Sequence, residues 1–351
     1  MSASRLYTLT AGKQDPTNTK TIRDTYARRL RGRFGALSAA MREAIVKDDV
    51  LGLRDSDLSE SDVDQLTETF GEQHELKAID SPPDLSSLPP AERIARFEDW
   101  LDEVEESEIL DVIQRDENIW VRRAYERGIK DANANLKNVG IPVSGANASD
   151  TIRVPVHQRR LESLFARNYA ELDGITDAVS QNISRELATG LSEGISPSEM
   201  ARRITDRVDK IGKTRATTLA RTEIINSHTE ATLQRYEEQD IETVGIEPEM
   251  RIQTAGDNSV CQECRTAAEQ GPWPISEFRG SGYQPPLHPN CRCAVLPVVN
   301  ETAAAAFQEH PVDFTVMLRA GAFVRNEGFY TALAQADADE ARELTAQAVA
   351  T

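Results

Sequence analysis

Apolar side chains recur every three or four residues along much of the chain, which is the spacing of one face of an α-helix. The first run extends from Ile22 to Ile45 and predicts an amphipathic helix. Its apolar positions are Ile22, Tyr26, Leu30, Phe34, Leu37, Met41 and Ile45. Basic residues gather in its N-terminal half, at Arg23, Arg28, Arg29, Arg31 and Arg33.

The same spacing predicts further helices over 92–110, 118–140, 161–187 and 213–239. Ser196 followed by Pro197 predicts another helix start, because serine caps free N–H groups and proline suits the first helical position. After residue 240 the texture changes to short β-branched stretches at 241–246, 249–255 and 293–299. Such stretches are typical of strands. We therefore expect a mainly α protein, with a multi-helix body and a small α/β cysteine-rich module near the C-terminus.

These patterns divide the chain into four segments. Residues 1–80 hold the basic N-terminal helix and an acidic segment, and residues 81–150 form a helical linker region. Residues 151–299 form the main domain, with the cysteine module at 241–299. An Ala-rich tail occupies 300–351 and is expected to end in an exposed helix.

Charge changes the picture in two ways. The net charge of −18 over 351 residues argues against a nucleic-acid groove along the whole protein. The charge is uneven, however: residues 1–47 carry ten Lys/Arg and three Asp/Glu, whereas residues 48–111 carry four and twenty-one. The plainer interpretation is a solvated acidic surface, of a kind that would suit high salt. The sharper one is a basic N-terminal helix that contacts DNA or an acidic partner.

The sequence lacks two features, a membrane span and a signal peptide, that would place the protein in or across a membrane. No apolar run approaches the length needed to cross a bilayer, and the first ten residues contain no apolar signal core. We therefore expect a soluble protein that does not contact a membrane and is not secreted by the usual route.

All four cysteines lie close together, which predicts a metal site in a reducing compartment. Cys261 and Cys264 have the C-x-x-C spacing of a zinc knuckle. Cys291 and Cys293 supply a second pair, and His288 can replace one of them. Because alternate residues of a strand point to opposite faces, Cys291 and Cys293 can share one ion only if the backbone turns locally.

We expect one structural Zn²⁺ in a closed tetrahedron, which ties the two ends of the Gly- and Pro-rich stretch 265–287. Cys261 and Cys264 are the first two ligands, Cys291 is the third, and His288 or Cys293 is the fourth. Free or packed thiols, or a disulfide such as Cys264–Cys291, are the alternatives.

An enzymatic interpretation competes with the structural one. His228-Thr-Glu230 followed by C-x-x-C has the order of the zinc nucleobase deaminases, in which the glutamate moves protons for a zinc-bound water. Val260 stands where that motif has proline, and His228 lies within a predicted helix. We expect no catalytic residues. A zinc-dependent deaminase or nuclease that uses His228 and Glu230 remains the alternative, and a host zinc-finger adaptor is the third.

The stretch "ARTEIINSHTEATLQRYEEQ", then C-x-x-C, then "HPNCRC" resembles the head-morphogenesis domain of tailed-virus minor head proteins, the bacteriophage Mu protein F-like family. The upstream "GLSEGISPSEMARRITDRV" is similar to the approach to that domain, so the resemblance covers about 187–299. Arg221, Thr222 and Glu223 match its R-T-E motif. Cys261, Cys264, His288, Cys291, Arg292 and Cys293 match its cysteine motif.

The resemblance implies a structural virion protein in the head, near the portal vertex, which is present in the host cytoplasm during assembly. The implied partners are the portal protein and the major capsid protein, and the implied role is head assembly with DNA packaging or delivery. The basic N-terminal helix would dock on such a partner, with its arginines near viral DNA or an acidic surface.

The R-T-E motif has a physical interpretation of its own. On a helical wheel Glu223 lies on the apolar side, where a carboxylate needs a cationic or hydrogen-bonding partner. Arg292 or Arg251 would supply that partner and join the helix to the cysteine module. The alternative is a solvated Glu223 at the helix surface.

Overall fold

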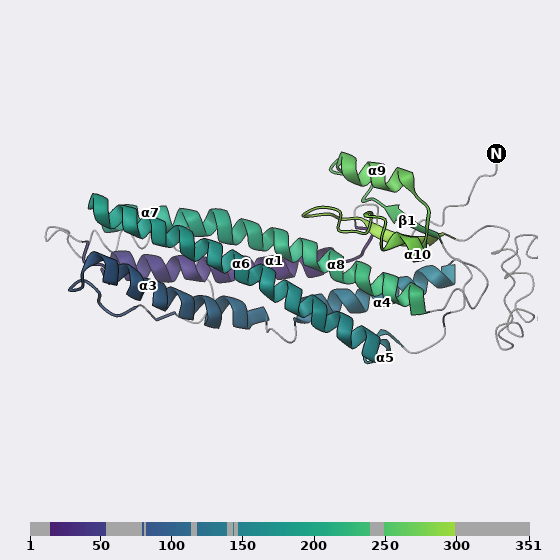
Figure 1. Cartoon of the computed structure of the whole chain (residues 1–351), viewed down its shortest axis with the longest axis horizontal. Helices are drawn as coiled ribbons and strands as arrows, with labels where there is room; N and C mark the ends of the chain where they lie inside the picture. The colour runs from purple at the N-terminus through teal and green to yellow at the C-terminus, as the bar shows by residue number, and fades with distance from the viewer. Residues whose placement is uncertain are drawn as a thin grey trace, which may run out of the picture. The chain divides into compact units, whose positions relative to one another are not determined.

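The structure is a computed structural model that describes residues 15–53, 79–80, 82–113, 118–138, 143, 147–238 and 249–298. The acidic segment 54–78, the predicted strand at 241–246 and the predicted tail at 300–351 lie outside the described residues. Over the described part the protein is mostly helical with a small sheet, so the predicted fold class is confirmed (Figure 1).

The helices predicted within the described residues are all present. The long ones are α1 (Lys20–Arg42), α3 (Pro90–Val104), α4 (Ile119–Asn138), α6 (Pro155–Glu193), α7 (Pro197–Arg207) and α8 (Thr214–Glu238). Ser196 caps α7 as predicted, since its Oγ accepts a hydrogen bond from the Glu199 N–H at 3.3 Å. Among the described residues, none of the helices combines the length and the apolar composition needed to cross a bilayer.

Chain contacts divide the protein into two units. One contains the described parts of Arg23–Ile119 and Glu162–Arg221, and we call it the helical unit. The other contains the described parts of Met1–Ile22, Trp120–Leu161 and Thr222–Thr351, and we call it the cysteine unit. Both units are therefore assembled from segments that are far apart in the sequence.

The helical unit has a core of large side chains from four helices. The predicted stripe of α1 is buried at Leu30, Phe34, Leu37 and Met41, and α3, α6 and α7 each contribute further buried apolar residues. Three helices continue into π-helical turns: η1 (Glu43–Lys47), η2 (Glu105–Leu110) and η4 (Val208–Lys213). In η4 an added Cβ on Gly212 would collide with the ring of Phe34, so glycine permits this close packing.

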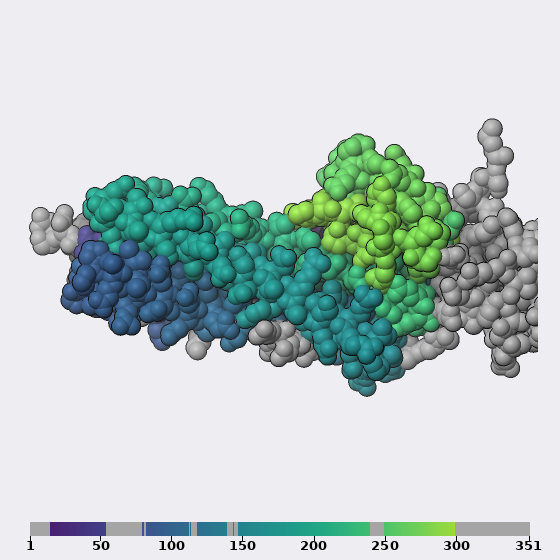
Figure 2. All heavy atoms as spheres, viewed as in Figure 1, coloured from purple at the N-terminus to yellow at the C-terminus, as the bar shows by residue number. Residues whose placement is uncertain are grey.

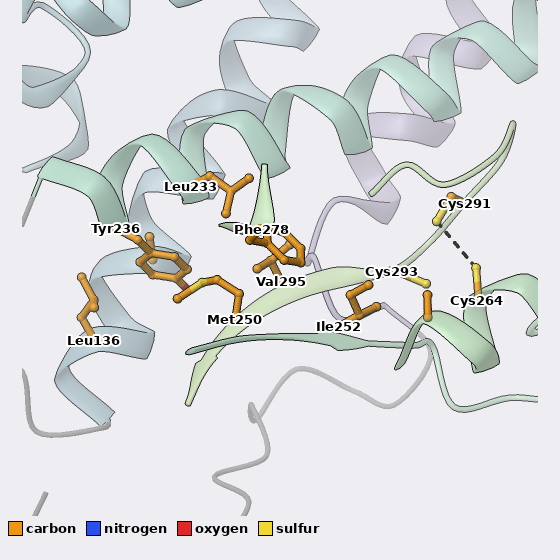
Figure 3. Packing of buried hydrophobic residues seen from close by; sticks show 12 residues of the cluster. Leu136, Leu233, Tyr236, Met250, Ile252, Cys264, Phe278, Cys291, Cys293 and Val295 are labelled. Carbon is orange, nitrogen blue, oxygen red and sulfur yellow. Dashed lines mark hydrogen bonds between the residues drawn. The ribbon is translucent and has the colours of Figure 1, made fainter. Parts of the chain in front are cut away.

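The cysteine unit contains a three-stranded antiparallel sheet in the order β2-β1-β3. The strands are β1 (Glu249–Gln253), β2 (Trp273–Pro274) and β3 (Ala294–Val298), with Ile252 opposite Val295. Met250 and Ile252 alternate with more exposed residues and face a core shared with α4 and α8. Figure 3 shows Leu136, Leu233 and Tyr236 beside Met250 and Phe278 in this core.

One part of the module differs from the prediction. Residues 265–287 were expected to be a loop, but α9 (Gln262–Gln270) and α10 (Ile275–Phe278) form within and beside this stretch. Ala267 and Phe278 are buried in the shared core, so the stretch closes partly by burial. Figure 2 shows residues 249–298, in green to yellow, as a continuous region of the surface.

Candidate metal centre

The first ligand pair lies at the start of α9. Cys261 occupies the N-cap position, and its Sγ accepts a hydrogen bond from the Cys264 N–H at 3.4 Å. Cys264 lies in the first helical turn and is buried. Because the residue at an N-cap and the one three positions later lie on the same side of a helix start, the C-x-x-C spacing brings the two sulfurs together.

The second ligand pair lies on a tight turn formed by residues 288–291. The Cys291 N–H donates to the His288 carbonyl at 3.1 Å, with Pro289 and Asn290 between them. Asn290 has φ of 63°, and proline at the second position with positive φ at the third defines a type II turn. Asparagine tolerates this left-handed conformation better than most residues do. The turn places His288 and Cys291 side by side, with the same spacing as the first pair.

The two pairs meet at Cys264, which belongs to both of the close groups of possible metal ligands. His288 Nε2 lies 3.2 Å from Cys261 Sγ and 3.1 Å from Cys264 Sγ. Cys264 Sγ lies 3.9 Å from Cys291 Sγ, the contact drawn as a dashed line in Figure 3. A tetrahedral zinc with bonds of about 2.0–2.3 Å separates its ligand atoms by about 3.5–3.8 Å. All four cysteines are free thiols, so no disulfide occupies the site. Sulfur and imidazole nitrogen are the ligand types of structural zinc sites, and the groups Cys261/Cys264/His288 and Cys264/Cys291/Cys293 are each close enough to hold a metal.

His288 presents the correct nitrogen to the sulfurs. Its Nδ1 donates a hydrogen bond to the Pro289 carbonyl at 2.8 Å. The lone pair for a metal is therefore on Nε2, which faces Cys261 and Cys264. Burial lowers the pKa of His288, but the Pro289 carbonyl and the Cys291 and Cys261 thiolates raise it to a value above the usual one. Hydrogen bonding of the second ring nitrogen is the usual way in which a metal-binding histidine is oriented.

Cys293 contacts this set of four through Cys291. Its sulfur, with those of Cys264 and Cys291, falls in a group whose members are within 4.8 Å of one another. A hydrogen bond from the Cys293 thiol, aided by backbone N–H groups, lowers the pKa of Cys291 to about 5. The same contact raises the pKa of Cys293, and burial raises that of Cys264 to about 12. Without metal, Cys291 is thus favoured as a thiolate while Cys264 and Cys293 stay neutral, and a dication would favour further thiolates.

All five predicted ligand residues come together. Two overlapping groups contain them: Cys261, Cys264 and His288, and Cys264, Cys291 and Cys293. Our prediction left His288 and Cys293 as alternatives for the fourth ligand. The signal that favours His288 was present in the sequence, because H-x-x-C repeats the spacing of C-x-x-C.

One residue of the R-T-E motif, Thr222, contacts the candidate site. Glu223 is buried as predicted, with 3% of its surface exposed, and Arg221 is exposed. Thr222 Oγ1 accepts a hydrogen bond from the Asn290 N–H, in the turn between His288 and Cys291, at 3.2 Å. The predicted role of Arg292 was wrong. Its two terminal nitrogens bind both carboxylate oxygens of Asp257, at 2.6 and 2.7 Å, so Asp257 and not Glu223 is its partner.

The residues of the enzymatic alternative are held elsewhere. His228 Nε2 lies 3.1 Å from Asp131 Oδ2 on α4. Glu230 binds Arg160 at 3.2 Å and Arg279 at 3.0 Å, and it also accepts a hydrogen bond from Gln284. Neither belongs to a group of metal-ligating side chains with the cysteines among the described residues. Glu230 instead joins α6 and the loop after α10 to α8.

Comparison with known proteins agrees with the resemblance seen in the sequence. Residues 181–296 match the family model described as Phage Mu protein F like protein. The chain therefore carries a Phage Mu F-like domain, which includes α8 and all five candidate ligands and links it to phage head proteins. Comparison with curated proteins and with solved structures finds no match.

Proposed function

We propose that this protein is a minor head protein of a tailed virus. It would associate with the portal vertex or the head interior and assist head assembly and DNA packaging or delivery. The observation that carries the proposal is the Phage Mu F-like match over 181–296, whose limits enclose the complete cysteine and histidine cluster. The portal and major capsid proteins are the proposed partners.

We further propose that the cluster holds one structural zinc. Cys261, Cys264, His288 and Cys291 would be its ligands, and Cys293 would donate a hydrogen bond to Cys291. Four protein ligands leave no position for a water, which supports an architectural and non-catalytic role. His228 contacts Asp131 and Glu230 binds Arg160, and these contacts away from the cysteines support the same role.

The first helix offers a surface for the partner. Arg28, Arg29 and Arg31 of α1 are exposed, whereas Arg23 is buried and Arg33 binds Glu108 at 2.6 Å. We propose that the three exposed arginines face an acidic partner surface or packaged DNA. Because the opposite face of α1 is buried in the helical unit, removal of the whole helix would disrupt the fold, and charge reversal is the better test.

The experiment is assembly of heads with full-length variants. Reversal of Arg28, Arg29 and Arg31 to Glu should reduce the amount of the protein in purified heads. Reversal of the exposed Arg185, Lys210 and Arg215, which changes the net charge equally, should not. Normal incorporation of the first variant would refute docking through α1. Absence of the wild-type protein from purified heads would refute the proposed function.

A second assay addresses the enzymatic alternative. The protein should not deaminate cytosine or adenine, and Glu230→Gln should leave head assembly unchanged. Deamination by the wild-type chain that is lost in Glu230→Gln would replace the structural proposal with the enzymatic one.

A further inference from the structure

The hydroxyl of Thr222 contacts the turn that carries two of the proposed ligands. Thr222 lies on α8, and its Oγ1 accepts the Asn290 N–H at 3.2 Å, although the two residues are 68 positions apart in the sequence. Asn290 is the third residue of the turn between His288 and Cys291. In a type II turn the hydrogen bond within the turn uses the N–H of the fourth residue, here Cys291. The N–H of the third residue is therefore available to Thr222.

This contact restrains the orientation of both ligands. Asn290 separates Cys291 from Pro289, and the Pro289 carbonyl fixes the ring of His288 through Nδ1 at 2.8 Å. A rotation of the peptide between Pro289 and Asn290 would move that carbonyl and the Asn290 N–H together, because they belong to one planar unit. By holding the N–H, Thr222 therefore also holds the carbonyl that orients His288.

Two more side chains of α8 fasten the same module. Glu230 binds Arg279 and Gln284, and Glu237 binds Arg279. Thr222, Glu230 and Glu237 are eight and then seven residues apart, close to two helical turns at each step, so they share one face of α8. Only Thr222 reaches the backbone of the ligand turn. The other two hold the chain between the two ligand pairs.

We propose that Thr222 is a positioning residue for the metal centre, acting through the Asn290 N–H on His288 and Cys291. This rests on the proposed zinc site. It also gives a physical reason for the presence of R-T-E and the cysteine motif in one domain: the helix residue supports the turn that completes the site. Outer hydrogen bonds of this kind typically change metal affinity by about 10–100-fold.

The test uses the full-length chain and isosteric substitution. Thr222→Val keeps the shape and removes the acceptor, and it should weaken zinc binding about tenfold in competition with a chromophoric chelator. The visible spectrum of the Co²⁺-substituted protein should also change, because His288 is no longer held in one orientation. Thr222→Ser retains a hydroxyl and should restore both properties. The Asn290 amide should exchange with solvent faster in the valine variant than in the wild type.

The matched control is Thr217→Val on the same helix. Thr217 donates its hydroxyl hydrogen to the Lys213 carbonyl at 2.7 Å within its own segment, so its loss should not change zinc affinity or the Co²⁺ spectrum. Equal effects of the two valine substitutions, or wild-type affinity in Thr222→Val, would refute the positioning role while the zinc site stands. A wild-type protein that binds neither zinc nor cobalt would refute the zinc site itself, and this role with it.

Discussion

The helical unit and the segment 249–298 of the cysteine unit differ in the residues that form their cores. In the helical unit, large apolar side chains such as Leu30, Phe34 and Leu101 are completely buried. In the segment 249–298 three of the buried core positions are cysteines: Cys264, Cys291 and Cys293. Its strands have only two to five residues each. Burial stabilises the first region, whereas we expect the second to depend on a metal crosslink between its ligand pairs as well as on its small core.

This contrast follows from size. A short segment buries a smaller fraction of its surface than a long one, so below a few tens of residues a metal or disulfide usually supplies the difference. The two regions should therefore respond to different perturbations. The following predictions address that contrast, from the largest expected effect to the smallest.

Loss of the metal should have the largest effect, and it should be confined to the cysteine module. Structural zinc contributes on the order of 10 kcal/mol at neutral pH. Cys261→Ser should abolish zinc binding and make residues 249–298 sensitive to protease, while circular dichroism still reports the helices. Elemental analysis of the wild type should give about one zinc per chain. A zinc-free wild type with a protease-resistant module would contradict this prediction.

The ligand set can be separated within the same experiment. His288→Asn should release zinc or weaken its binding strongly, because the nitrogen ligand is lost. Cys293→Ser should retain about one zinc per chain, since the Cys293 sulfur is not one of the four proposed ligands. The opposite pattern would show that Cys293, and not His288, completes the site.

A cavity in the helical unit should produce the reverse pattern. Phe34 is completely buried and its ring packs against Gly212. Phe34→Ala should lower the free energy of unfolding by about 3–5 kcal/mol in a urea titration. Zinc content under native conditions should not change. Loss of zinc in this variant would show that the metal centre depends on the helical core.

The pH dependence of the helical unit should depend on one buried carboxyl group. Burial, with Asp102, Asp177 and Asp173 nearby, raises the pKa of Glu105 from 4.5 to about 8, against the opposing hydrogen bond from Ser180. The folded protein therefore keeps a proton that the unfolded chain releases above pH 4.5. The free energy of unfolding should fall as the pH rises towards 8, on the order of 3 kcal/mol by pH 7.

Glu105→Gln removes this ionisation. Stability curves of wild type and variant, measured between pH 5 and pH 8, should differ mainly in slope, and the variant should show the flatter curve. Metal removal should be avoided in this series, so that only the helical unit contributes. Equal slopes would show that Glu105 does not keep its proton in the folded state.

The smallest effect concerns the charged contacts that fasten the module to α8. Glu230 is mostly buried and binds two arginines, so Glu230→Ala should destabilise the module by roughly 1–3 kcal/mol. Glu237 is more exposed, and Glu237→Ala should cost about 1 kcal/mol or less. Limited proteolysis of residues 249–298 would report both. A larger effect for Glu237 would contradict the assignment of Glu230 as the main contact.

Local patterns explain which features were predictable from the sequence. The α1 stripe and the Ser196-Pro197 start depend on neighbours within a few residues, and both were predicted. The helix α9 was missed because its N-cap is a cysteine and glycine and proline follow it. The Arg292–Asp257 pair was also missed, since the partners are 35 residues apart and nothing local selects Asp257 over Glu223. Only the fold brings such pairs together.

The two ligand pairs also influence how the site assembles. Each pair spans only four residues, so its two ligands are close along the chain, whereas Cys264 and His288 are 24 positions apart. We expect a metal ion to bind one ligand pair first and the other pair afterwards. Completion of the site then requires one further step, a search in which the chain between the pairs closes and brings the second pair to the metal. Because the entropy of closure grows only with the logarithm of loop length, insertions between the pairs should delay this search little. We therefore expect an insertion in the exposed part of the intervening segment to leave the metal affinity nearly unchanged.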